Sequence, residues 1–413
     1  MSTNYRSLCQ VYCLTVVQYI SFDNNFLPFS CGGDFSIKLW LFISTSHFFD
    51  MIPVFKPRLP VYDDLEPYLR EMDASNMYSN FGPLGNRLCR SLAENFGSNV
   101  QNICLVSSGT SGLLACLSVL IECIPKDKAE ITVGVPAWSF VATAQVPAFQ
   151  GVQILFIDVN SNGFVNPTND LNLDILIVTS PFGEALDIDF WNIYAERTGI
   201  KLLFDCAAGF DTVTSSDFPT VVSTHATKGF STGEGGFVIS NDAEFIAKIR
   251  SFSNFGMNKS RISLGLGLNL KMSEINCAYG LAALNNKQKY LQPYLDQIAG
   301  YNHLFGSSNT QIKIFNSQFL RTTYNILIPP CEVSRDDLIL ALLTIFGIEA
   351  RNWWGDPLHM KPQFRTGITS NSTYPTANDL SYRVIGLPVG CHVTFEMQAY
   401  IVESVLKILN LEV

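Results

Sequence analysis

Short β-rich runs alternate with helical segments over residues 102–208, and this alternation limits the chain to few folds. The β-rich runs are 102–108, 130–137, 152–159, 174–181 and 200–208. Apolar residues recur at helical spacing over 111–124, and 190–199 is typical of a helix that ends at a glycine. Strands that alternate with helices form a mostly parallel sheet with helices on both faces. We therefore predict an α/β protein whose ligands bind at the carboxyl ends of its strands.

Polar or aromatic residues follow three of these strands. Gly109, Thr110 and Ser111 stand between the first strand and its helix, where free backbone amides bind phosphate, although an ordinary helix cap explains the same residues. Trp138 ends the second strand, where it would cover a flat ring or simply pack in the core. Asp205 follows a buried strand, so its carboxylate needs a partner, a shifted pKa or a role as helix cap.

Lys228 lies in the stretch "VVSTHATKGFSTGEGGFVIS", residues 221–240, between a histidine-threonine run and a glycine-rich turn. A solvated surface charge is one interpretation. The other is a lysine held for Schiff-base chemistry. A phosphate site, an aromatic cover, a carboxylate for a protonated ring nitrogen and a Schiff-base lysine together bind pyridoxal phosphate. The combination predicts a site for this cofactor.

The composition excludes several other classes of protein. Lys and Arg number 27 against 36 Asp and Glu, a net charge of -9 with no basic run that would bind a phosphate backbone. Nucleic-acid binding is therefore not expected. The 11 cysteines form no pattern with metal-ligand spacing, so we expect no metal site. Buried thiols fit a reducing compartment, and we interpret the protein as cytoplasmic.

Residues 1–50 do not match the rest of the chain. Two apolar runs lie there, but each is shorter than the roughly 20 residues of a membrane span, and Asp23 and Asp34 lie between them. A signal peptide is an alternative, since Arg6 precedes an apolar run, yet no clean cleavage site follows. We expect no membrane segment, and we interpret residues 1–50 as an extension outside the fold, which begins at Met51.

The order of motifs resembles one enzyme family. The segments "SSGTSGLLACL", "VPAWSFVATA", "FDCAAGFD", "STHATKGFSTGEGGF", "NFGMN", "GLNLKMSEINCAYGLAAL" and "ARNWWGDPLH" are similar to successive motifs of the DegT/DnrJ/StrS family of pyridoxal phosphate-dependent sugar-nucleotide aminotransferases. They span about residues 52–410. The resemblance implies fold type I: a large domain, 51–290, with a mostly parallel seven-stranded sheet, and a smaller C-terminal α/β domain, 291–413. It also implies a homodimer with shared active sites.

The resemblance also implies roles for individual residues. Lys228 would form the Schiff base, Asp205 would pair with the pyridine nitrogen, and Trp138 would stack on the ring. The phosphate would bind to Gly109, Thr110 and Ser223, and Asn254 would reach the phosphate of the neighbouring subunit's cofactor. Ala208 departs from the family pattern, which commonly has a polar residue near the phenolic oxygen of the cofactor. The lysine itself argues against dehydratase relatives, which carry histidine instead.

The expected reaction moves an amino group from L-glutamate to a nucleotide-linked keto-deoxysugar, a 4-keto-6-deoxyhexose in the commonest family members, for amino-sugar, polysaccharide or O-antigen biosynthesis. A 3-keto sugar, a dehydratase or other pyridoxal enzyme, and a non-catalytic relative stay open as alternatives. Trp353 and His359 are expected to shape the sugar-nucleotide pocket, although tryptophans of this segment also suit a small-domain core. Asn269 and Lys271 are expected to approach the same pocket, with Lys271 meeting diphosphate charge.

Overall fold

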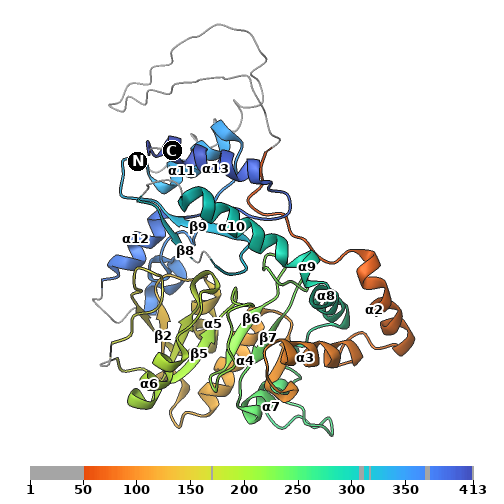
Figure 1. The fold of residues 1–413 in the computed structure, drawn as a ribbon. Coiled ribbons are helices and arrows are strands. Elements are labelled where there is room, and N and C mark those ends of the chain that lie inside the picture. The colour runs from red at the N-terminus through yellow and green to blue at the C-terminus, as the bar shows by residue number, and fades with distance from the viewer. Residues whose placement is uncertain (1–50, 169–170, 307–310, 316–317, 368–372, 412–413) are drawn as a thin grey trace, which may run out of the picture. The chain divides into compact units, whose positions relative to one another are not determined.

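A seven-stranded sheet with the order β1-β7-β6-β5-β4-β2-β3 forms the centre of the larger part of the structure (Figure 1). In this computed structural model, residues 51–168, 171–306, 311–315, 318–367 and 373–411 are described. The interpretation of residues 1–50 therefore lies outside the described residues. The strands are β1 (Ile103–Val106), β2 (Thr132–Pro136), β3 (Gln153–Ile157), β4 (Ile175–Thr179), β5 (Lys201–Asp205), β6 (Thr220–Ser223) and β7 (Gly236–Ile239).

The strand directions confirm a mostly parallel sheet. β7 runs antiparallel to β1 and β6, whereas the pairs β2–β3, β2–β4, β4–β5 and β5–β6 are parallel. All five strands expected from the β-rich runs are present. β6 and β7 lie near the two ends of the stretch 220–240. The glycine-rich residues between them show no strand periodicity, so the sequence pattern did not predict these two short buried strands.

Helices cover both faces of this sheet, as predicted. Alternate residues of one strand point to opposite faces, so Leu202 and Phe204 belong to one apolar cluster and Leu203 to the other. The first cluster includes residues of α3, α6 and α8, and the second includes residues of α4 and α5 with two from α7. The helices are α2 (Tyr62–Ser75), α3 (Pro83–Asn95), α4 (Gly109–Glu122), α5 (Ala142–Gln150), α6 (Ile188–Thr198), α7 (Ala243–Phe252), α8 (Glu274–Asn285) and α9 (Lys287–Tyr290).

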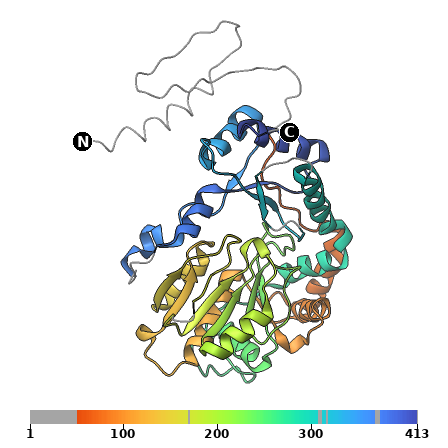
Figure 2. The same cartoon turned by 60° about the vertical axis from the view of Figure 1, so that its left-hand side comes forward.

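A second, four-stranded antiparallel sheet lies in the C-terminal part of the chain, which Figure 2 shows in blue and teal. Its order is β10-β11-β9-β8, and its helices complete an α/β arrangement. The elements are α10 (Gln292–Gly306), β8 (Lys313–Phe315), β9 (Thr323–Leu327), α11 (Arg335–Phe346), β10 (Arg351–Asn352), α12 (Pro375–Arg383), β11 (Val384–Pro388) and α13 (Phe395–Ile408). The smaller C-terminal α/β part is thus confirmed, and the exact division at 290/291 stays a prediction.

Short 3₁₀ helices lie in the connections, at Val100–Asn102, Lys128–Glu130, Pro181–Gly183, Leu358–Met360 and Pro362–Gly367.

No helix among the described residues is long and apolar enough to cross a membrane. The described residues also contain no group of three or more His, Cys, Asp or Glu side chains that would hold a metal ion.

Candidate active site

Asp205 and Lys228 come together because neighbouring parallel strands end at the same edge of the sheet. Asp205 is the last residue of β5 and pairs in register with Val221 of β6. Lys228 follows in the turn between β6 and β7. The Asp205 side chain is buried and accepts hydrogen bonds from the Thr143 hydroxyl, 2.8 Å, and the backbone N–H of Ala207, 3.3 Å. Asp205 is therefore a buried carboxylate at a strand end and not a helix cap.

Burial and mutual attraction set the charge state of this pair. Burial raises the pKa of Asp205, against the lowering effects of the Thr143 hydrogen bond and of Lys228. Burial lowers the pKa of Lys228, with Asp205 opposing that shift and Arg321 adding to it. Desolvation favours the neutral form of each group. An amine with a lowered pKa is more easily neutral, and a neutral amine is the form that reacts with an aldehyde.

The start of α4 lies directly against the end of β6. A Cβ added to Gly109 would come within 2.9 Å of the Ser223 Cβ, so glycine is required for this approach. The Ser108 hydroxyl caps α4 by accepting from the backbone N–H of Ser111, 3.0 Å. The structure thus brings Gly109, Thr110 and Ser223 together at a capped helix N-terminus, where backbone amides favour an anion.

The two aromatic residues after β2 differ sharply in exposure. Trp138 is 2% exposed, its ring packs against Phe182 and Trp354, and its indole N–H donates to the carbonyl of Trp353, 2.9 Å. Phe140 is 58% exposed. The stacking role of Trp138 stays a prediction, and its core packing is observed. Phe140 is the exposed ring in this loop.

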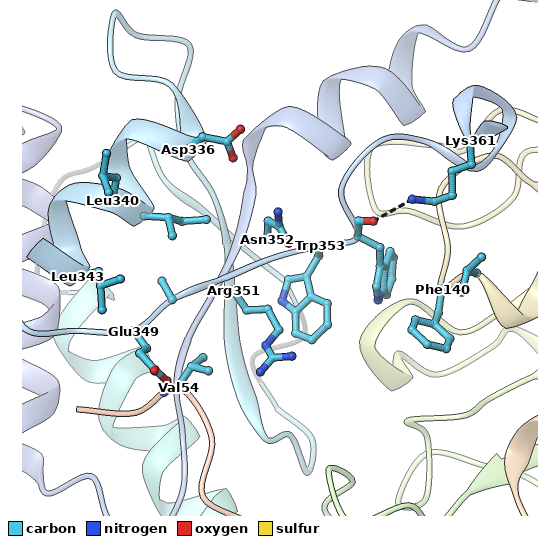
Figure 3. Close-up of a pocket in the computed structure, with 14 residues that line it drawn as sticks. Val54, Phe140, Asp336, Leu340, Leu343, Glu349, Arg351, Asn352, Trp353 and Lys361 are labelled. Atoms are coloured by element: carbon cyan, nitrogen blue, oxygen red, sulfur yellow. Dashed lines mark hydrogen bonds between the residues drawn. The ribbon is translucent and has the colours of Figure 1, made fainter. Parts of the chain in front are cut away.

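A cavity of about 750 Å³ opens beside Phe140 (Figure 3). Trp353 and Trp354 line it, together with the cations Arg351 and Lys361. The Lys361 ammonium donates to the Trp354 carbonyl, 3.3 Å, which holds this part of the wall together. The cavity wall therefore combines acidic, aromatic and basic side chains, which suits a ligand with both polar and apolar parts.

His359 does not line this cavity. Its ring packs at 4.1 Å from the Tyr374 ring and at 6.4 Å from the Phe156 ring. Burial lowers its pKa, against a raising effect of Asp158. Of the expected sugar-pocket residues, Trp353 lines the cavity and His359 does not.

Asn254, Asn269 and Lys271 form a separate cluster. The Lys271 ammonium donates to the Asn254 side-chain oxygen, 2.9 Å, and Asn254 and Asn269 face each other in an isolated β-bridge. None of the three is among the lining residues of the cavity. The three predicted residues are thus brought together with each other, but not with Trp353 in the same chain.

The donor set fits pyridoxal phosphate. The Gly109–Ser223 contact leaves a backbone surface for a phosphate, Asp205 supplies a buried carboxylate, and Lys228 supplies an amine with a lowered pKa. The mostly parallel seven-stranded sheet with its smaller C-terminal α/β part is the fold of the type I pyridoxal phosphate-dependent transferases.

Sequence and structure comparisons agree with this class. The profile of the DegT/DnrJ/EryC1/StrS aminotransferase family matches residues 62–406, and the chain belongs to that family. It is therefore a pyridoxal phosphate-dependent aminotransferase. Protein Rv3402c of Mycobacterium tuberculosis is 27% identical, over 86% of this chain and 89% of the relative.

Two further relatives carry named activities. The dTDP-4-amino-4,6-dideoxy-D-glucose transaminase of Shigella dysenteriae is 26% identical, over 86% of this chain and 99% of its own. The solved structure of Helicobacter pylori PseC, an aminotransferase involved in the biosynthesis of pseudoaminic acid, superposes with a TM-score of 0.77. It covers 87% of this chain and 100% of its own at 20% identity, which supports the fold.

Sequence reasoning missed three residues at this site. Phe140 and Thr143, the partner of Asp205, follow Trp138 in the loop after β2 and in the first turn of α5, so the end of β2 was a usable signal. Arg321, which influences Lys228, lies almost a hundred residues further along the chain. No local pattern marks it, because only the packing of the C-terminal part against the first sheet brings it to the site.

Proposed function

We propose that this aminotransferase moves an amino group from L-glutamate to a nucleotide-linked keto-deoxysugar, with a 4-keto-6-deoxyhexose as the acceptor. The observation that carries the proposal is the amine and carboxylate pair at the strand ends, together with a cavity lined by Arg351, Lys361 and Phe140. Phe140 lies three residues before Thr143, which donates to Asp205. Named relatives support the acceptor class: one is a dTDP-4-amino-4,6-dideoxy-D-glucose transaminase and another a GDP-perosamine synthase.

Each residue of the pair has a distinct task in this proposal. Pyridoxal phosphate, when bound, supplies a ring that accepts electrons from the carbon bearing the amine. Asp205 pairs with the ring nitrogen and holds a proton there. Lys228 anchors the cofactor and, when free, carries a proton at Nζ to and from the reacting carbon. Its lowered pKa suits this task, since a neutral amine is the form that accepts a proton.

The cavity provides groups suited to a sugar nucleotide. Arg351 and Lys361 are positive side chains for the two phosphates of the nucleotide, and arginine binds such oxygens through its planar fork. Trp353, Trp354 and Phe140 offer aromatic surface for the base or the sugar. His359, which does not line the cavity, would support the segment through its contact with Tyr374.

The proposal is tested by separating the two half-reactions. Glutamate alone should convert the bound cofactor to its amine form, seen as loss of its yellow absorbance. A nucleotide-linked 4-keto-6-deoxyhexose added to the gel-filtered protein should restore that absorbance, whereas a 3-keto isomer should not. Restoration by the 3-keto sugar alone would reassign the carbon, and no response to any nucleotide sugar would reject the acceptor class.

Lys271→Ala should raise the apparent KM for the nucleotide sugar and leave the glutamate half-reaction largely unchanged. The ammonium is bonded to Asn254, so its expected contact is with phosphate charge and not with the reacting carbon. The loss of one charge-assisted contact corresponds to roughly a 10-fold or greater rise in KM. Lys248→Ala, at an exposed lysine of α7 outside the loop that follows Asn254, is the matched control. Equal damage to both half-reactions would assign Lys271 to the cofactor or the fold.

We also propose that the enzyme is a homodimer whose subunits share active sites. Next to Asn254, Phe255, Ile262, Leu264, Leu266 and Leu268 form an exposed apolar loop; Leu264 is 74% and Leu266 85% exposed. Side chains of this kind gather at protein interfaces. A partner that covers the loop would also receive Asn254 and Lys271 at its own site, which accounts for their separation from the cavity.

Leu266→Asp should therefore weaken the dimer, because a charge buried at an interface without a partner costs several kcal/mol. Sedimentation velocity at micromolar concentration should show monomers, together with faster loss of cofactor. Ile193→Asp, at a 63% exposed residue of α6, is the control and should leave the mass unchanged. A wild-type monomer, or an unaltered dimer in the Leu266 variant, would contradict the shared-site arrangement.

A further inference from the structure

Arg321 is a buried cation just before β9. Its side chain is 4% exposed. Its Nη2 donates to the carbonyl of Gly183, 2.6 Å, and its Nη1 donates to the carbonyl of Leu320 and lies 3.4 Å from an Asp211 carboxylate oxygen. Its Nε–H is buried and has no hydrogen-bond partner in the described part of the chain. An unpaired buried donor costs free energy, so a bound acceptor would complete this side chain.

The residues on either side of Arg321 contact the residues on either side of Lys228. The hydroxyl of Thr322 donates to the carbonyl of Thr227, 2.8 Å. Leu320 packs so closely that a Cβ added to Gly229 would come within 2.4 Å of its Cγ. The two short segments are therefore held side by side, and the arginine lies within electrostatic reach of the lysine.

The same arginine is anchored next to Ala208, which offers no polar side chain. A Cβ added to Gly183 would lie 2.2 Å from the Ala208 carbonyl oxygen, so the two backbones are in contact there. Gly183, whose backbone contacts Ala208, also supplies the carbonyl that accepts from Arg321. The charged Arg321 side chain, which comes from the C-terminal part, thus lies near Ala208, a position that has no polar side chain of its own.

Few charged side chains interact with the Lys228 amine and the Arg321 guanidinium in the described part of the chain. Lys228 faces Asp205 and Arg321, and Arg321 faces Asp211 and Glu184. Burial lowers the pKa of Arg321 to about 10, against the effects of the two acids, so the guanidinium stays charged at neutral pH. A purely structural role, in which Arg321 links the two parts of the chain, would explain the contacts to Gly183 and Asp211. It would not explain why the Nε–H has no partner in the described part of the chain.

We propose that Arg321 binds an anionic oxygen beside Nζ of Lys228. Two oxygens lie next to that nitrogen in the chemistry of the site: the phenolic oxygen of the cofactor, adjacent to its aldehyde carbon, and the carboxylate of the amino donor. Either would complete the Nε–H with a charge-assisted hydrogen bond. The inference rests on the proposed attachment of the cofactor to Lys228.

The test is Arg321→Gln in the cofactor-saturated enzyme, read by two spectroscopic titrations. If the phenolic oxygen is bound, the pH midpoint of the cofactor absorbance without donor should rise by about one unit or more, because a nearby cation disfavours protonation. If the donor carboxylate is bound, that midpoint should stay and the apparent dissociation constant for glutamate should rise about tenfold or more. Arg321→Lys should restore part of either effect.

Controls separate this role from a structural one. Arg335→Gln removes another buried arginine, 6% exposed, that bonds to Asp336 and the Ser381 carbonyl, and it should move neither titration. Arg321→Gln/Asp211→Asn keeps the local charge balance if the single variant does not fold. If neither the pH midpoint nor the dissociation constant for glutamate changes in a folded variant, Arg321 has only a structural role in linking the two parts of the chain. Failure of borohydride to fix the cofactor on wild-type Lys228 would instead reject the proposed attachment.

Discussion

Lys228→Ala should abolish transamination and leave the fold intact. Lys228 is proposed to anchor the cofactor and to carry the proton, and proton transfer by a positioned side chain contributes about 10²- to 10⁴-fold on its own. A drop of at least that size in turnover with glutamate is therefore expected. The fold should survive, because burial disfavours the charge of this lysine and its removal relieves that cost.

The measurement combines single-turnover kinetics with circular dichroism and a borohydride trap. Wild-type protein should yield a cofactor-bearing peptide containing Lys228, and the variant should yield none. Lys201→Ala, at the opposite end of β5, is the matched control and should keep both activity and labelled peptide. Glutamate-dependent turnover near the wild-type rate in folded, cofactor-saturated Lys228→Ala would remove the lysine from its assigned role.

The sequence predicts the sheet and the candidate cofactor residues at its strand ends better than it predicts the candidate substrate site. Asp205 lies at the end of β5, as expected, because a polar residue after a buried strand is a local pattern and strand ends gather at one edge of a parallel sheet. Gly109 follows the first strand by the same rule, whereas Ser223 was expected only from the family resemblance, and the structure shows the two in contact. The cofactor roles of these residues stay predictions.

Residues outside that rule could not be placed from local patterns. Trp138 and Phe140 are two positions apart and both aromatic, and only packing shows that one is buried and the other exposed. His359 belongs to the expected segment but does not line the cavity, and its ring packs on Tyr374 instead. Arg321 depends on how the C-terminal part packs against the first sheet, which no residue spacing records.

Asp205→Asn should lower turnover strongly without loss of stability. The substitution keeps the shape of the side chain but removes the charge proposed to hold a proton on the ring nitrogen. The loss of a charge-assisted hydrogen bond corresponds to roughly 1.5–3 kcal/mol, or about a 10- to 150-fold slower reaction. Cofactor binding should change far less, since Gly109, Ser223 and Lys228 are untouched.

Stability distinguishes this role from a structural one. Burial raises the pKa of Asp205, so folding of the cofactor-free protein costs free energy once pH exceeds the ordinary pKa of an aspartate, and this cost grows until the raised pKa is passed. An asparagine removes that cost and can keep the contact with Thr143. The melting temperature of the cofactor-free variant at pH 7 should therefore equal or exceed that of wild type, while turnover falls. A lower melting temperature with unchanged turnover would make Asp205 a structural residue, because its charge would then serve the fold and not the ring.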